Sequence, residues 1–139
     1  MSSIDLVRYI TFEKHLSENT ELVSANRDSQ LPFPIERVYY MKGVGPNDKK
    51  GNHANIRNEQ VMLAIQGSFK VLVDDGEHQQ SFEVNSFSTG LYLPNLTWRT
   101  VYDFSADAIC MVFCSTKYDP ADYIKDYDKF LDLISTSNN

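Results

Sequence analysis

The chain has 139 residues, of which 42% are hydrophobic and 23% are charged, a composition typical of one globular domain and unlike that of a disordered chain. Thirteen Lys and Arg against nineteen Asp and Glu give a net charge of −6, which argues against the nucleic-acid-binding class because that class needs a basic surface. The apolar runs are too short for a membrane span. The first residues also lack the basic and apolar regions of a secretory signal. We therefore expect a cytoplasmic protein with no nucleic-acid or membrane partner.

The sequence predicts a single domain over residues 1–139, with an irregular polar arm over 1–30 and β-structure over 31–117. Short stretches rich in β-forming residues alternate with turn signals such as Asp74–Gly76. The run 61–65 is apolar on both faces and should be an inner strand. Many short strands at regular spacing are typical of an all-β sandwich or barrel. The expected strands cover 35–41, 61–65, 69–74, 80–84, 90–93, 98–104 and 108–115.

The C-terminal segment changes to a helical period, and we expect a helix over 119–135. Asp119 and Pro120 have the residue types of an N-cap and a first helical position. Tyr123, Tyr127 and Phe130 then fall on one helical face. This aromatic face should pack on the outside of the β-structure. A helix that binds a partner protein is the alternative.

Two spaced motifs indicate where the chemistry lies. Alternate residues of a strand share a face, so His53 and Asn55 should point inward together. The spacing from His53 to Gly67, and from Pro94 to Arg99, resembles the two signature motifs of the cupin superfamily. That resemblance implies a small antiparallel jelly-roll barrel. A bound metal would need several imidazoles or carboxylates, whereas Asn is a poor ligand and Arg a permanent cation, so we expect no metal.

A longer ordered series, covering roughly residues 31–130, resembles the sugar 3,4-ketoisomerases that act on dTDP-4-oxo-6-deoxyglucose. Its pieces include PFPIERVYY at 32–40, GNHA at 51–54, DDG at 74–76 and GLYLP at 90–94. The resemblance implies an enzyme that moves the ketone of a dTDP-linked 4-oxo-6-deoxyhexose from C4 to C3 through an enediol, on the way to deoxyamino sugars of surface glycans such as lipopolysaccharide. It implies neither metal nor redox cofactor. It also implies a homodimer with exchanged N-terminal strands, which would cover exposed strand edges.

The candidate catalytic residues are His53 and Asn55. The resemblance implies histidine at both positions and assigns the base to the second, but the amide of Asn55 cannot accept a proton at physiological pH. His53 is then the one candidate base of the motif. Its alternatives, a hydrogen-bond donor to the substrate and a structural histidine, remain open.

Five further residues are candidates for substrate binding. The motif position of Arg99 predicts contact with sugar or pyrophosphate oxygens, and its alternative is an ion pair with Glu59. Arg37 could bind phosphate or form a surface ion pair. The rival function, motivated by Asn55, is a non-catalytic cupin that binds a dTDP-linked sugar. A metal-dependent cupin is disfavoured by Asn55 and Arg99. The five candidates are Arg37, Tyr39, Lys50, Glu59 and Arg99.

Overall fold

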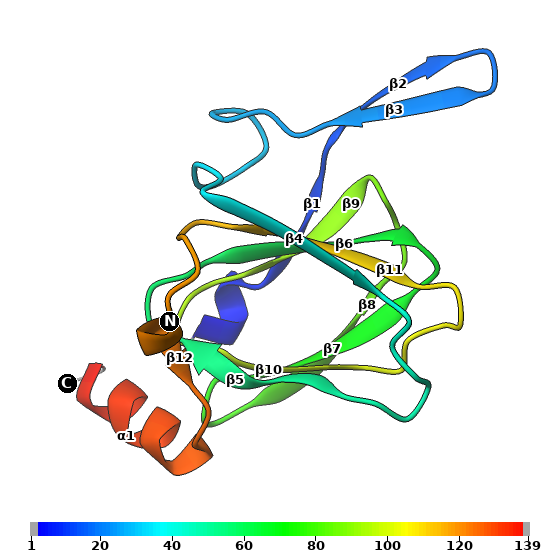
Figure 1. Ribbon diagram of the computed structural model, residues 1–139. Coiled ribbons are helices and arrows are strands. Elements are labelled where there is room, and N and C mark those ends of the chain that lie inside the picture. Colours follow the sequence, from blue (N-terminus) through cyan, green and yellow to red (C-terminus); the bar gives the residue numbers. More distant parts are fainter. Residues whose placement is uncertain (1–2, 138–139) are drawn as a thin grey trace.

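The computed structural model describes residues 3–137, whose strands form two five-stranded antiparallel sheets and one separate hairpin (Figure 1). Sheet 1 has the order β1 (Arg8–Thr11), β9 (Thr89–Leu93), β6 (Gln60–Gln66), β11 (Ile109–Cys114) and β4 (Arg37–Lys42). Sheet 2 has the order β12 (Tyr123–Ile124), β5 (Lys50–Asn55), β10 (Trp98–Tyr102), β7 (Phe69–Asp74) and β8 (Gln79–Val84). The predominantly β, antiparallel architecture with one helix, α1 (Tyr127–Ser137), is confirmed.

The main core lies between the two sheets. It forms because alternate residues of each strand point to the same side: Phe69, Val71 and Val73 of β7 are fully buried. They belong to one apolar cluster with Met62 of β6 and Val112 of β11. The alternate apolar residues of the strands are thus buried by packing one sheet on the other.

The outer face of sheet 1 is covered as well. Val61 and Leu63 of β6 point away from the main core and pack in a second cluster with Phe12, Leu31 and Phe33. Residues 31 and 33 belong to the segment that leads from β3 into β4, which lies over this face. The prediction of an inner strand buried on both sides is therefore confirmed for β6.

The N-terminal region differs from the irregular arm that the sequence predicted over residues 1–30. It contains a 3₁₀ helix, η1 (Ser3–Leu6), and β1, which pairs with β9 at the edge of sheet 1. β2 (Glu13–Ser17) and β3 (Thr20–Ser24) form a hairpin that projects from the sheets (Figure 1). Burial of Ile10 and Phe12 explains the regular structure of β1, because their alternation lets the strand join the second cluster.

The C-terminal helix begins at Tyr127, eight residues later than predicted. Asp119 caps only a 3₁₀ turn, η2 (Pro120–Asp122), by accepting a hydrogen bond from the Ala121 N–H (3.0 Å). β12 then pairs with β5. Extended pairing with the edge of sheet 2 thus interrupts the helical pattern, and Tyr123 lies in a strand.

The packing expected of α1 is confirmed. Asp126 caps the helix, since its Oδ1 accepts hydrogen bonds from the N–H groups of Asp128 and Lys129. The ring of Phe130 is fully buried and lies 5.7 Å from that of Trp98, on the outer face of sheet 2. Among residues 3–137, no helix has both the length and the apolar character that crossing a membrane would require.

Candidate active site

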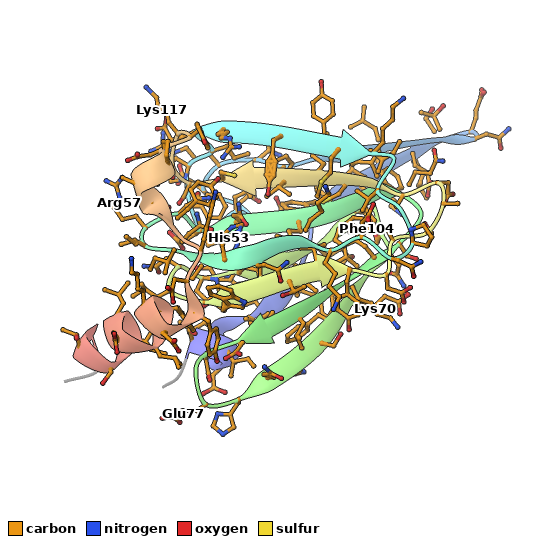
Figure 2. The ribbon with its side chains drawn as sticks, turned by 60° about the horizontal axis from the view of Figure 1, so that its bottom comes forward. His53, Arg57, Lys70, Glu77, Phe104 and Lys117 are labelled. Carbon is orange, nitrogen blue, oxygen red and sulfur yellow. The ribbon has the colours of Figure 1, made fainter. Side chains whose placement is uncertain are left out.

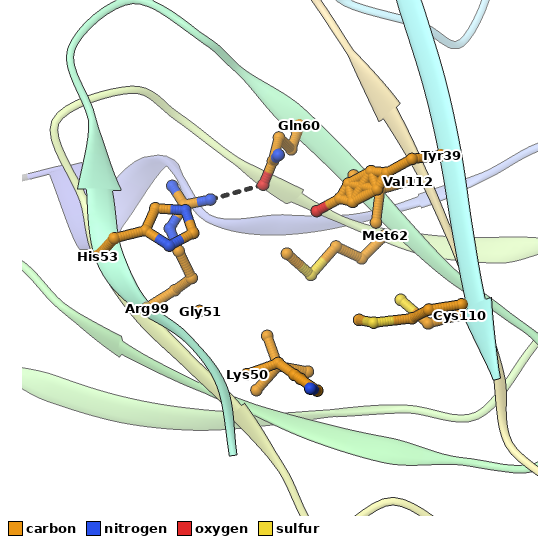
Figure 3. A pocket seen from close by; sticks show the side chains of 11 residues that line it. Tyr39, Lys50, Gly51, His53, Gln60, Met62, Arg99, Cys110 and Val112 are labelled. Carbon is orange, nitrogen blue, oxygen red and sulfur yellow. Dashed lines mark hydrogen bonds between the residues drawn. The ribbon is translucent and has the colours of Figure 1, made fainter. Parts of the chain in front are cut away.

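A cavity of about 180 Å³ lies between the two sheets. Its apolar wall comes from β4, β6, β10 and β11, and its polar end comes from β5, β10 and the start of β6 (Figure 3). Among the described residues that line it, Lys50 and Arg99 are positively charged and none is an acid. The cavity therefore favours an anionic ligand or an intermediate that develops negative charge. Its lining residues are Tyr39, Met41, Lys50, Gly51, His53, Gln60, Met62, Arg99, Val101, Cys110 and Val112.

Arg99 places a buried positive charge in this cavity. Its side chain is 1% exposed, and its Nε and Nη2 groups donate to the Thr97 carbonyl at 3.2 and 3.1 Å. Nη1 donates to Gln60 Oε1 at 2.5 Å (Figure 3). These three bonds use three of the five guanidinium donors, so two N–H groups are without a protein acceptor among the described residues. Burial lowers the pKa of Arg99 to about 10, and the group stays charged at neutral pH.

His53 lies beside Arg99, because the two residues are register partners on β5 and β10. Its ring is inside the β-structure, whereas Arg57 and Lys117 lie at the periphery (Figure 2). Burial, and then the charge of Arg99, lower the pKa of His53 to about 4. The imidazole is therefore neutral at physiological pH. Its Nε2 atom is buried and has no hydrogen-bond partner among residues 3–137.

Tyr39 reaches the cavity from the opposite sheet, on β4. Burial raises the pKa of its hydroxyl far above the physiological range, so the phenol stays protonated and can both donate and accept hydrogen bonds. Lys50 lines the cavity at the start of β5. Cys110, in the apolar wall, is a thiol because burial raises its pKa to about 12.

Three of the predicted site residues do not line the cavity. Arg37 lies behind Tyr39: its guanidinium is 4.7 Å from the Tyr39 ring centroid and donates to the Tyr123 hydroxyl at 3.3 Å. Glu59 accepts a hydrogen bond from the Tyr92 hydroxyl at 2.5 Å rather than pairing with Arg99. The side chain of Asn55 is fully buried, and its Nδ2 donates to Asp122 Oδ2 at 3.2 Å.

The polar residues of the cavity do not form a metal site of the usual kind. Among residues 3–137, no group of three or more His, Cys, Asp or Glu side chains lies close enough to hold a metal ion. One imidazole beside a guanidinium also does not suit a divalent cation, because the guanidinium repels it.

Most of the chain matches known proteins. The family described as "FdtA: WxcM-like, C-terminal" matches residues 5–135. A TDP-4-oxo-6-deoxy-alpha-D-glucose-3,4-oxoisomerase of Aneurinibacillus thermoaerophilus is 36% identical over 131 residues, which cover 94% of each chain. This chain belongs to the FdtA-like family of sugar 3,4-ketoisomerases.

Solved structures of family members share the fold. QdtA, a sugar 3,4-ketoisomerase from Thermoanaerobacterium thermosaccharolyticum in complex with TDP, matches with a TM-score of 0.90 and 30% identity, covering 94% of this chain and 96% of that one. A variant of QdtA in complex with TDP-4-keto-6-deoxyglucose matches equally well in TM-score and identity, covering 94% of each chain. WlaRA, a TDP-fucose-3,4-ketoisomerase from Campylobacter jejuni, matches with a TM-score of 0.87 and 34% identity, covering 91% and 94%.

In this member of the ketoisomerase family, the structure brings together Tyr39, Lys50, His53 and Arg99 of the seven residues predicted from sequence. Sequence reasoning missed Gln60, which holds Arg99. Strand alternation offers a signal for it, because Gln60 shares a face with the inward Met62. It also missed Asp122, since that residue was assigned to a helix.

Proposed function

We propose that the protein is a metal-independent nucleotide-sugar 3,4-ketoisomerase that converts dTDP-4-oxo-6-deoxyglucose to the 3-oxo sugar, in the synthesis of deoxyamino sugars. The observation that carries the proposal is the meeting of a neutral imidazole, a buried guanidinium with free donors and a protonated phenol in one cavity. Removal of a proton next to a carbonyl needs a base and donors at the developing oxyanion. Relatives named for this reaction support the assignment.

In the proposed reaction, His53 takes the proton from C3. The C3–H electrons form the C3=C4 double bond of the enediolate, and the C4 carbonyl electrons move to O4. The imidazolium then returns its proton to C4, so that the sugar is isomerised without an oxidant or reductant. His53 has a free lone pair at neutral pH because its pKa is low, and the negative enediolate favours the protonated ring at the moment of transfer.

Arg99 and Tyr39 form hydrogen bonds with the sugar oxygens O3 and O4 in the proposed reaction. The free N–H groups of Arg99 stabilise the enediolate, and their effect is large because the side chain is fully buried. The Tyr39 hydroxyl donates its proton to O4 while it accepts the proton of the C3 hydroxyl. The net transfer is one proton from C3 to C4 and one from O3 to O4, as an isomerisation requires.

The volume of the cavity indicates which part of the substrate it encloses. At about 180 Å³, it is smaller than the roughly 300–1,000 Å³ of sites that enclose a drug-sized ligand. It suits the sugar ring, and the dTDP portion would then lie outside. Lys50 lines the cavity and is also exposed to solvent, whereas Arg37 does not line it, so we place the diphosphate near Lys50 at the mouth of the cavity and assign Arg37 to the support of Tyr39.

The proposal is tested by incubating the protein with dTDP-4-oxo-6-deoxyglucose in D₂O and following the sugar by NMR. We expect conversion to the 3-oxo sugar, with deuterium at C4 in those turnovers in which the imidazolium exchanges its proton with the solvent before returning it, and no loss of activity after treatment with EDTA. Calorimetry with dTDP separates the rival function. Binding of dTDP without any isomerisation or exchange would show a non-catalytic cupin instead.

We also propose that the two sheets form the cupin jelly-roll barrel of the family and that the chain is a cytoplasmic homodimer. Exposed apolar side chains on the projecting hairpin and on the edge strand β4 support the dimer: Leu16 and Leu22 are 70% and 55% exposed, and Tyr40 is 73% exposed. Light scattering should give twice the chain mass at micromolar concentration. Leu16→Asp should shift this mass toward the monomer, and a monomeric wild-type protein would refute the dimer.

A further inference from the structure

Asp122 binds the end of the strand that carries His53. Its carboxylate is 3% exposed and accepts three hydrogen bonds: Oδ1 from the Arg57 N–H (2.8 Å), and Oδ2 from the Asn58 N–H and from Asn55 Nδ2 (both 3.2 Å). Its backbone carbonyl also accepts from the Ile56 N–H at 2.9 Å. A single buried residue from η2 thus fixes residues 55–58.

This contact determines which way the Asn55 amide points. A carboxylate only accepts hydrogen bonds, so the amide nitrogen must face Asp122 and the amide oxygen must face away from it. That oxygen, Oδ1, is buried and has no partner among the described residues. The side chains of residues 53 and 55 lie on one face of β5, and His53 Nε2 is the other buried, unpartnered atom of this strand.

We propose that Asn55, oriented by Asp122, is a positioning residue that fixes the tautomer of His53. Its Oδ1 accepts the Nε2–H proton, which leaves the Nδ1 lone pair free to take the C3 proton. The catalytic role of this tautomer rests on the proposed function. The tautomer itself can be measured in a protein that does not turn over substrate. Asn55 plays the orienting part that an asparagine plays in Cys–His–Asn sites. In this structure the two atoms do not meet the geometry of a hydrogen bond, as is common for catalytic contacts before the substrate binds.

Two acceptors near the His53 ring compete to set its tautomer. Burial and then the charge of Arg99 lower the pKa of His53, whereas the nearby Gly51 backbone and then the nearby Asn55 side chain raise it by smaller amounts. The Gly51 carbonyl would favour the opposite tautomer, with a proton on Nδ1, so the two partners make different predictions. The titratable and charged groups around the ring are Tyr39, Lys50, Arg99, Asp122, Tyr123 and Lys125.

The test is ¹⁵N NMR of the histidine rings across pH in the protein without substrate. The chain has three histidines, and His15 and His78 are exposed, so His15→Gln and His78→Gln assign the His53 signals. We expect the Nε2–H tautomer for His53. Asn55→Ala should abolish that preference and lower the pKa of His53, and it should reduce kcat roughly tenfold to a hundredfold, as for partners that orient a metal-bound histidine, with little change in KM.

Two variants separate positioning from folding. In Asp122→Asn the new carboxamide leaves one backbone N–H of residues 57 and 58 without its acceptor, and when its NH₂ faces Asn55 the Asn55 amide must turn. The tautomer should then become mixed, and a thermal melt measures the loss of stability separately. Arg57→Ala removes an exposed guanidinium that lies 3.6 Å from Asp122 Oδ1 and donates to Asp119 Oδ2 at 3.1 Å, but it keeps the backbone N–H that bonds Asp122, so the tautomer should not change. The Nδ1–H tautomer in the wild type, or an unchanged tautomer and pKa in a folded Asn55→Ala protein, would overturn the inference. The expected tautomer without isomerase activity would refute the proposed function alone.

Discussion

The cavity between the sheets and the contact between α1 and the outer face of sheet 2 both bury a charged group, but they satisfy it differently. At the helix contact, the carboxylate of Asp74 accepts hydrogen bonds from the Gly76 N–H (2.7 Å), Gln79 Nε2 (2.9 Å) and the Tyr127 hydroxyl (2.8 Å). In the cavity, Arg99 has only neutral partners and retains two free N–H groups. Buried polar groups without partners cost free energy. We infer that the helix contact stabilises the fold and that the cavity binds a ligand that accepts the free hydrogen bonds of Arg99.

The largest expected effect tests the cavity side of this comparison. His53→Asn should reduce kcat by about 10²–10⁴-fold, the usual contribution of a positioned base, while the protein stays folded. Steady-state kinetics by NMR, with a thermal melt as the control for folding, measure both. Activity within threefold of the wild type would show that another residue carries the proton.

The matching change at the helix contact should act on stability alone. Phe130 is fully buried against Trp98 and Tyr127, and Phe130→Ala should lower the free energy of unfolding by about 3–5 kcal/mol. Urea unfolding followed by the fluorescence of Trp98, the one tryptophan of the chain, measures this loss. The kcat of the remaining folded protein should equal that of the wild type. A selective fall in kcat would mean that the two regions are coupled.

Lowering the pH should reduce the free energy of unfolding because His53 lies buried in the cavity as a neutral imidazole. His53 has a folded-state pKa of about 4, below its ordinary value of about 6.5. The unfolded chain therefore binds the proton first, and stability declines as the pH falls from about 6.5 toward 4. The contribution of His53 is on the order of 3 kcal/mol. Urea unfolding at pH 7 and pH 4.5 should show a larger loss for the wild type than for His53→Asn. Equal losses would mean that the imidazole is not desolvated.

The smallest expected effect distinguishes the roles of Lys50 and Arg37. Lys50→Ala should raise KM about tenfold, equivalent to about 1.4 kcal/mol, because a charge-assisted contact to the diphosphate is lost. Arg37→Ala should change kcat instead, since Arg37 packs on Tyr39 and bonds Tyr123. Initial rates over a range of substrate concentrations separate the two parameters. The reverse pattern would place the diphosphate near Arg37, at the start of β4.

The strands were predictable because their signals are local. Alternation of apolar and polar residues identified β7, and unbroken apolar character identified β6 as an inner strand. Gly67 follows β6 for a reason visible in the structure: it has φ = 69°, and a Cβ there would clash with Ser105 Oγ. The predicted start of the C-terminal helix was wrong because residues 123–124 pair with β5 instead of forming a helical turn. This partner strand lies more than sixty residues away in the sequence.

The sequence predicted seven of the strands, β4 and β6 to β11, together with the aromatic face of α1 and the motif positions of His53 and Arg99, since periodicity, turn residues and motif spacing are properties of neighbouring residues. It missed β1, β2, β3, β5 and β12. Which of the predicted residues share the cavity depends on the packing of the two sheets. Tyr39 and Gln60 enter it from sheet 1, and Asp122 reaches Asn55 across 67 residues. Such contacts depend on how two sheets pack and which strand edges remain unpaired, and the free energy that fixes them comes from burial of the whole core rather than from any local segment.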